Sequence, residues 1–133
     1  MALVDLPPEI SEFEHSDGAI VVVNREGVIV LMSKPAEELF GVAAEDIVGE
    51  FIEMLVPEKK RWGHQAYRRG YQAEPSYREM DPGLEPEAER PMDGMLVPIH
   101  VQLDPHQIDG HLYVAAHVTA VGEPHEPETP AAN

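Results

Sequence analysis

The last third of the chain contains two stretches in which apolar side chains recur at every second position. In a strand, successive side chains point to opposite faces, so a period of two predicts a strand with one buried face. We expect strands over residues 97–104 and 112–119, joined by a turn within residues 104–110. Their apolar positions are Val97, Ile99, Val101 and Leu103 in the first strand, and Leu112, Val114, Ala116 and Val118 in the second. His100 and Gln102 are expected to face outward.

A second pair of strands is predicted near the start of the chain. Residues 18–23 and 28–32 are apolar and rich in β-branched side chains, and residues 24–27 between them have turn chemistry. Between the two strand pairs, the sequence predicts short helices over residues 34–40 and 43–48 and a longer helix over residues 58–73. Ser33 is expected to cap the first of these helices. Strands at both ends with helices between them favour an α+β domain, with one antiparallel sheet covered on one face.

Three segments are expected to lie outside this compact unit. Residues 1–15 form a lead-in with a short helix, on which Ile10 and Phe13 share a face. Residues 74–91 contain four prolines and many acidic residues, which predicts a long acidic loop with few contacts. Residues 122–133 form a tail rich in proline and glutamate that is expected to be disordered. The domain itself is predicted to span residues 16–121.

Composition excludes several classes of protein. The chain has 133 residues and no cysteine, so disulfides and thiolate metal sites are excluded. A net charge of −16 disfavours nucleic-acid binding, because phosphate backbones repel an acidic surface. No apolar run approaches the roughly 18 residues of a membrane span, and no secretory signal is recognisable. We expect a cytoplasmic protein with no membrane contact.

No motif in the sequence indicates catalysis or a metal site. Phosphate-binding loops, nucleophile elbows and paired metal ligands on one helix are all missing from the sequence, so no enzyme activity and no metal are expected. The histidines of the last strand pair, such as His100 and His117, are expected to be exposed sheet positions. The basic residues within 59–69 are expected to pair with acidic groups of the same chain.

Several motifs resemble the PAS superfamily. The resemblance runs from about residue 16 to residue 121 and includes residues 16–24, 30–41, 45–49, 55–57 and 93–99, in the order found in that family. Two positions depart from the usual pattern. Ser33 stands where asparagine is common, and the last strand ends in His117-Val118-Thr119 where many members have Asp-Ile-Thr.

The resemblance implies a fold and a class of function. The fold would be a five-stranded antiparallel sheet with short helices and one longer helix on one face. The function would be that of a sensory module that binds a small apolar ligand or a protein partner. It would relay its state by forming a homodimer, with Ile10 and Phe13 as contacts, or by binding a separate effector protein. Trp62, Tyr67, Ile99, Val101, Leu103, Val114 and Ala116 are the residues expected to line the ligand pocket.

Two alternatives remain open at this point. Residues 55–67 are similar to the corresponding run of heme-binding PAS oxygen sensors, which implies His64 as an axial ligand of heme iron. The domain could instead be a protein–protein adaptor with a filled core and no ligand. The sequence does not identify a cofactor beyond this heme alternative.

Overall fold

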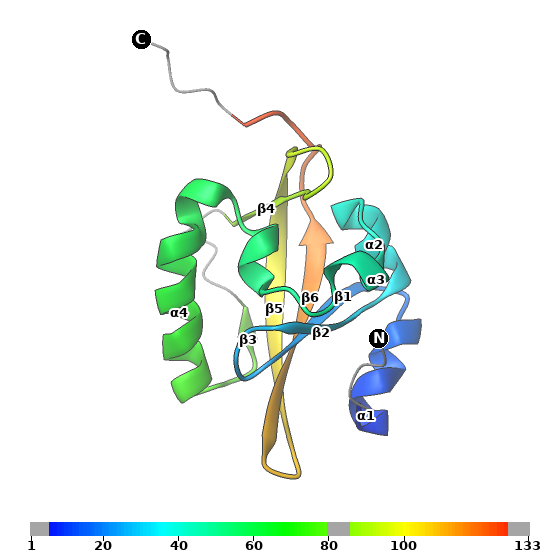
Figure 1. Cartoon of the computed structure of the whole chain (residues 1–133), viewed down its shortest axis with the longest axis vertical. Helices are drawn as coiled ribbons and strands as arrows, with labels where there is room; N and C mark the ends of the chain where they lie inside the picture. Colours follow the sequence, from blue (N-terminus) through cyan, green and yellow to red (C-terminus); the bar gives the residue numbers. More distant parts are fainter. Residues whose placement is uncertain (1–5, 80–85, 128–133) are drawn as a thin grey trace.

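A computed structural model describes residues 6–79 and 86–127 of the chain. One antiparallel sheet forms its centre, with strand order β2-β1-β6-β5-β3, and β4 pairs with a different part of β5 (Figure 1). The predicted α+β class and antiparallel sheet are confirmed, but the sheet has six strands rather than five. The strands are β1 (Ala19–Asn24), β2 (Ile29–Met32), β3 (Arg78–Glu79), β4 (Glu87–Glu89), β5 (Leu96–Ile108) and β6 (His111–Ala120).

The hairpin of β5 and β6 is longer than its sequence pattern predicts. Pairing continues to Ile108 and His111, and the turn consists only of Asp109 and Gly110. Both turn residues have positive φ, 52° and 81°, which matches the tight two-residue turns that favour Asp-Gly in hairpins. Pro105 has no N–H to donate to a neighbouring strand, but it does not end β5. The strand β3 pairs only with Leu103 and Gln102, so no strand on that side needs a hydrogen bond from position 105.

The helices follow the predicted order. They are α2 (Lys34–Phe40), α3 (Ala44–Ile47), and α4 (Arg61–Ala73), with 3-10 turns η2 (Ile52–Leu55) and η3 (Glu58–Lys60) leading into α4. Ser33 does not cap α2 with its side chain, contrary to the prediction. Its buried hydroxyl instead accepts a hydrogen bond from the Ile20 amide at 2.9 Å and donates one to the Gly18 carbonyl at 2.8 Å. Ser33 therefore ties the start of α2 to β1.

The two faces of the sheet are covered by different parts of the chain. Val101 and Ile99 are buried in the main core on the α4 side, as predicted, while His100 is exposed. On the opposite side lie α1 (Pro8–Ser11) and η1 (Glu12–His15) (Figure 1). Ile10 is completely buried there against the sheet. Ile10 is therefore part of this chain's own core, and the expectation that it forms a dimer contact is wrong.

The acidic segment is more structured than predicted. Residues 80–85 lie outside the described part of the chain, but both flanks of that gap form strands on β5. Ala88 of β4 is buried in the main core, and Glu89 pairs with Arg61 at 3.0 Å. The prediction that residues 74–91 make few contacts is wrong for these flanks, because β5 is long enough to pair with both.

Part of the predicted disordered tail also packs on the domain. His125 forms a backbone bridge with Leu96, and its Nε2 lies 2.8 Å from a carboxylate oxygen of Glu87. The tail thus contacts β5 and β4 at His125, while residues 128–133 lie outside the described residues.

The strand register of β5 makes a direct prediction about stability. Val101→Ala removes buried methyl groups from the core and should lower the free energy of unfolding by about 1–3 kcal/mol. His100→Ala, the matched control on the exposed face of the same strand, should change it by less than about 0.5 kcal/mol. Urea denaturation of the two variants checks this, and the reverse order would contradict the register.

Candidate functional site

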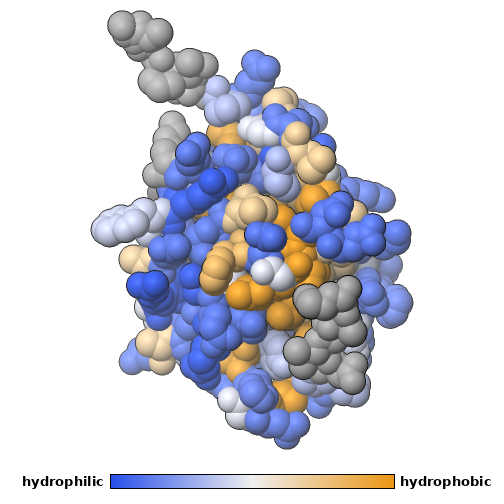
Figure 2. Space-filling view, viewed as in Figure 1, coloured by the Kyte–Doolittle hydropathy of each residue, from blue (hydrophilic) through white to orange (hydrophobic). Residues whose placement is uncertain are grey.

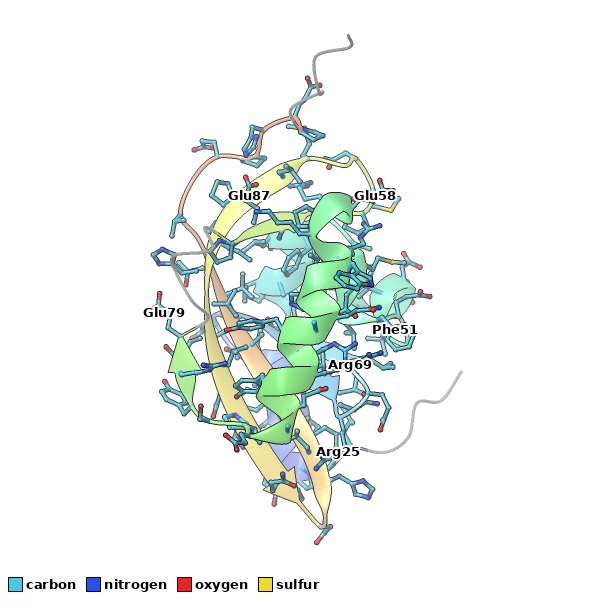
Figure 3. All side chains as sticks on the ribbon, turned by 90° about the vertical axis from the view of Figure 1, so that its left-hand side faces the viewer. Arg25, Phe51, Glu58, Arg69, Glu79 and Glu87 are labelled. Atoms are coloured by element: carbon cyan, nitrogen blue, oxygen red, sulfur yellow. The ribbon has the colours of Figure 1, made fainter. Side chains whose placement is uncertain are left out.

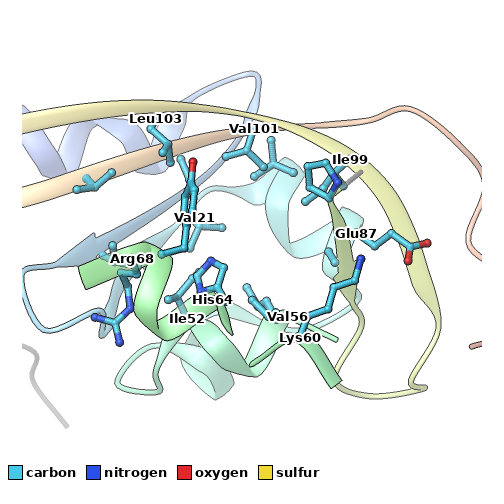
Figure 4. Close-up of a pocket in the computed structure, with 18 of the residues that line it drawn as sticks. Val21, Ile52, Val56, Lys60, His64, Arg68, Glu87, Ile99, Val101 and Leu103 are labelled. Atoms are coloured by element: carbon cyan, nitrogen blue, oxygen red, sulfur yellow. The ribbon is translucent and has the colours of Figure 1, made fainter. Parts of the chain in front are cut away.

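A cavity of about 590 Å³ lies between α4 and the inner face of the sheet (Figure 4). Its volume falls within the range of roughly 300–1,000 Å³ found for small-molecule sites. Strands β1, β5 and β6 supply one wall, and η2, α4 and β4 supply the others. Six of the seven predicted pocket residues line it: Tyr67, Ile99, Val101, Leu103, Val114 and Ala116. These six residues therefore lie together around one cavity.

Trp62 is the exception and its predicted place in the pocket wall is wrong. The side chain is 84 % exposed and does not line the cavity. α4 turns a different face toward the cavity, and that face carries His64, Tyr67, Arg68 and Tyr71. Trp62 and Arg69 lie on the other stripe of the helix, and Figure 3 shows Arg69 on its outward side.

Apolar side chains also reach the surface near the helices. Figure 2 shows an apolar area in the middle of the face seen in Figure 1, bordered by polar side chains. Phe51, just before η2, and Met54, within it, are among the exposed large apolar side chains of the described residues.

A buried carboxylate binds two of the polar residues that line the cavity, His64 and Arg68. Glu53 of η2 is only 5 % exposed. Its Oε2 lies 2.7 Å from Nδ1 of His64 and accepts a hydrogen bond from Nε of Arg68 at 2.9 Å. A second Arg68 nitrogen donates to Oε1 at 3.2 Å, so the arginine binds both carboxylate oxygens. This Glu53–His64–Arg68 cluster satisfies a charge that would otherwise be costly to bury.

The charge state of Glu53 follows from these partners. Burial by itself raises the pKa of the carboxyl, but hydrogen bonds from Arg68 and His64 and their positive charge outweigh it. The net result is a pKa below the ordinary value of 4.5. Glu53 is therefore ionised throughout the neutral range.

The cluster continues to the turn between β1 and β2. Arg68 donates to the Glu26 carbonyl at 3.1 Å, and Gln72 donates to the Asn24 carbonyl at 3.1 Å. Gly27 of the same turn has φ +83°, and a β-carbon there would lie 2.4 Å from the Arg68 guanidinium. Only glycine fits this close approach. α4 is thus held to both η2 and the first hairpin.

The far end of α4 is fixed by its tyrosines. The Tyr71 hydroxyl donates a hydrogen bond to the Ser76 carbonyl at 2.6 Å, and burial raises the pKa of this hydroxyl. The Arg78 guanidinium lies over the rings of Tyr67 and Tyr71, 5.7 and 5.3 Å from their centres. These contacts position the cavity-facing side of α4 along its length.

Two histidines of the last hairpin, His106 and His117, are partly buried, whereas His100 and His111 are exposed as predicted. His106 and His117 both approach one oxygen of Asp104, at 3.1 and 3.4 Å. The Phe13 ring packs edge-on against both imidazoles. His100 pairs with Thr119 rather than facing His117. This group joins the N-terminal turn to the sheet, and within the described residues no cluster of three or more potential ligands has the arrangement needed for a metal ion.

Comparisons with known proteins identify the family. The model of the PAS fold matches residues 11–116. The PAS domain of a protein from Desulfitobacterium hafniense has a similar structure, with a TM-score of 0.69, 14 % identity, and coverage of 84 % of this chain and 99 % of that one. The PAS domain of the RpfR quorum-sensing receptor from Cronobacter turicensis, solved in complex with BDSF, gives a TM-score of 0.63 and 14 % identity, with 81 % and 97 % covered. The chain belongs to the PAS family.

One curated relative adds a functional class. Sensor protein FixL from Bradyrhizobium diazoefficiens is 29 % identical over 105 residues, which make up 79 % of this chain and 21 % of that protein. The chain therefore spans about a fifth of the relative it matches. The family consists of sensory modules of signal transduction, as the sequence resemblance implies. In the described part of the chain, no helix is long and apolar enough to cross a membrane.

The sequence indicates the residues that α4 contributes to this site, but it does not indicate Glu53. His64, Arg68 and Gln72 are spaced by four residues, which places them on one face of a helix and is a usable signal. Glu53 carries no such signal, because it is one acidic residue among 25 and lies in a short apolar segment. Only the fold shows that it is buried.

The cluster predicts a large effect of one small substitution. Glu53→Gln removes the charge but keeps the shape, so Arg68 and His64 face one amide oxygen and one NH2 donor in place of two carboxylate oxygens. Unfolding in urea should become easier by about 3 kcal/mol. Glu50→Gln, an exposed neighbour with the same change in charge, should be close to neutral. Equal behaviour of the two variants would show that the cluster does not stabilise the fold.

The pH dependence of stability gives a second test of the same group. Because the folded-state pKa of Glu53 is lowered, its contribution is complete above about pH 4.5 and is lost as pH falls through the folded-state value. The difference in unfolding free energy between the wild type and Glu53→Gln should therefore be constant near neutral pH and shrink in acid. A difference that grows in acid would contradict the assigned direction.

Proposed function

We propose that this PAS domain is a sensory module that holds a small, largely apolar ligand in the cavity between α4 and the sheet. The observation that carries the proposal is the cavity itself, whose volume and lining fit a small-molecule site. A scaffold that works only through its surface has no physical need for such a space, since empty apolar volume destabilises a core.

The proposal includes a route by which ligand binding could reach other parts of the chain. α4 contributes His64, Tyr67 and Tyr71 to the cavity, and the same helix is bonded to the first hairpin through Arg68 and Gln72. A ligand that shifts α4 would act on both the Glu53 cluster and the turn at residues 24–27. The output would be a changed surface for a second copy or a separate effector protein.

Native mass spectrometry of the purified full chain tests ligand retention. We expect added mass from a retained small molecule, or uptake when apolar compounds are supplied. Ala116→Phe, which places a large ring in the cavity wall, should abolish this binding. Ala120→Phe, on the exposed end of the same strand, should preserve it, with circular dichroism confirming that both variants fold. Binding that is unchanged in Ala116→Phe would place the ligand elsewhere and contradict the proposal.

A second candidate is heme, and one observation favours it. Nδ1 of His64 is held by Glu53, and Nε2 has no hydrogen bond to any described residue although the side chain lines the cavity. A histidine whose other nitrogen is held by a carboxylate has the arrangement commonly found in metal-bound histidines. His64 would hold the iron, and Lys60 would be available to a propionate, since Arg68 is already bound to Glu53. Bound heme would supply a site for a diatomic gas.

Heme titration separates this candidate from the first. Heme ligation predicts a sharp, stoichiometric Soret band that is lost in His64→Ala and kept in His111→Ala, a control at an exposed histidine. Weak, broad absorption that is the same in both variants would remove heme and leave the apolar-ligand proposal in place.

A further inference from the structure

The polar groups around the cavity differ in whether they are already used within the protein. Arg68 binds Glu53, Gln72 binds the Asn24 carbonyl, and the Tyr71 hydroxyl binds the Ser76 carbonyl. Glu87 lies 2.8 Å from Nε2 of His125. Each of these groups has a partner on the protein, so none needs one from a ligand.

Lys60 is the cation at the cavity that lacks such a partner. It lines the cavity and is exposed, and no ion pair or hydrogen bond joins its ammonium group to another described residue. Basic residues are scarce, with nine against 25 acidic residues, and Arg61, Arg68, Arg90 and Lys34 are each paired with a carboxylate. Of the two described lysine and arginine side chains that line the cavity, Arg68 is paired with Glu53 and Lys60 is not paired.

The position of Lys60 sets the shape of a matching ligand. Figure 4 shows Lys60 at the end of the cavity next to Glu87, with His64 in the middle and Leu103 and Val21 toward the other end. One end of the cavity thus carries the unpaired ammonium group of Lys60 beside Glu87, whose partner is His125, and the wall along the sheet is apolar. A ligand that satisfies both regions has one anionic group joined to an extended apolar body.

We propose that the cavity binds an aliphatic carboxylic acid, with the carboxylate at Lys60 and the chain along β5 and β6. This inference rests on the proposed function and names the ligand class for the same site. A monoanion fits better than a phosphate, because Lys60 supplies a single positive charge and Glu87 lies at the same end. Heme also joins carboxylates to an apolar body, so the probe must be an acid without iron.

Decanoic acid and 1-decanol form a matched pair of probes for isothermal titration with the full chain. The two share the same chain length and differ in the charged group. The acid should bind roughly tenfold more tightly, and Lys60→Gln should reduce its affinity to about that of the alcohol. Lys60→Arg should retain the preference for the acid.

Arg69→Gln provides the control for net charge. Arg69 is an exposed cation on the outward side of α4, so its loss changes the overall charge equally without touching the cavity (Figure 3). It should leave the preference for the acid intact. Equal binding of acid and alcohol, or an acid preference unchanged in Lys60→Gln, would overturn this inference while leaving an apolar ligand site standing. Binding of neither probe, together with no retained ligand in native mass spectrometry, would overturn both.

Discussion

The ion pair between Glu53 and Arg68 is the contact on which the arrangement of the site depends. It joins two separate helical segments, η2 and α4. Arg68 binds both oxygens of the nearly buried Glu53 carboxylate. A charge buried this far is tolerated only with several partners, and His64 supplies the third hydrogen bond. The same arginine reaches the first hairpin through the Glu26 carbonyl. Arg68 therefore links α4 both to η2 and to the first hairpin.

The cavity lies between the sheet and α4, and α4 is held to the rest of the domain by polar contacts at its edge. Val101 and Val114 contribute both to the core and to the cavity wall. The proposed ligand would lie between the sheet and a helix that is fixed at defined points.

Much of this could be predicted from the sequence, and the failures have physical causes. Alternation in β5 and β6 correctly predicted the inward-facing residues, because a period of two is a local property. The prediction that Trp62 lines the pocket was wrong, because the spacing of residues along a helix does not reveal which face of the helix packs on the sheet. The strands β3 and β4 escaped prediction because they are two and three residues long and depend on pairing with β5. Glu53 escaped because burial of a single acid is a tertiary property.

Amide hydrogen exchange in wild type and Glu53→Gln tests most directly whether this ion pair holds α4 in place. Loss of the pair should release α4 from η2 and the first hairpin while the sheet remains paired. The account predicts faster exchange in Arg61–Ala73, with little change in the paired amides of β5 and β6. Unchanged exchange in α4, or equal acceleration in helix and sheet, would contradict it.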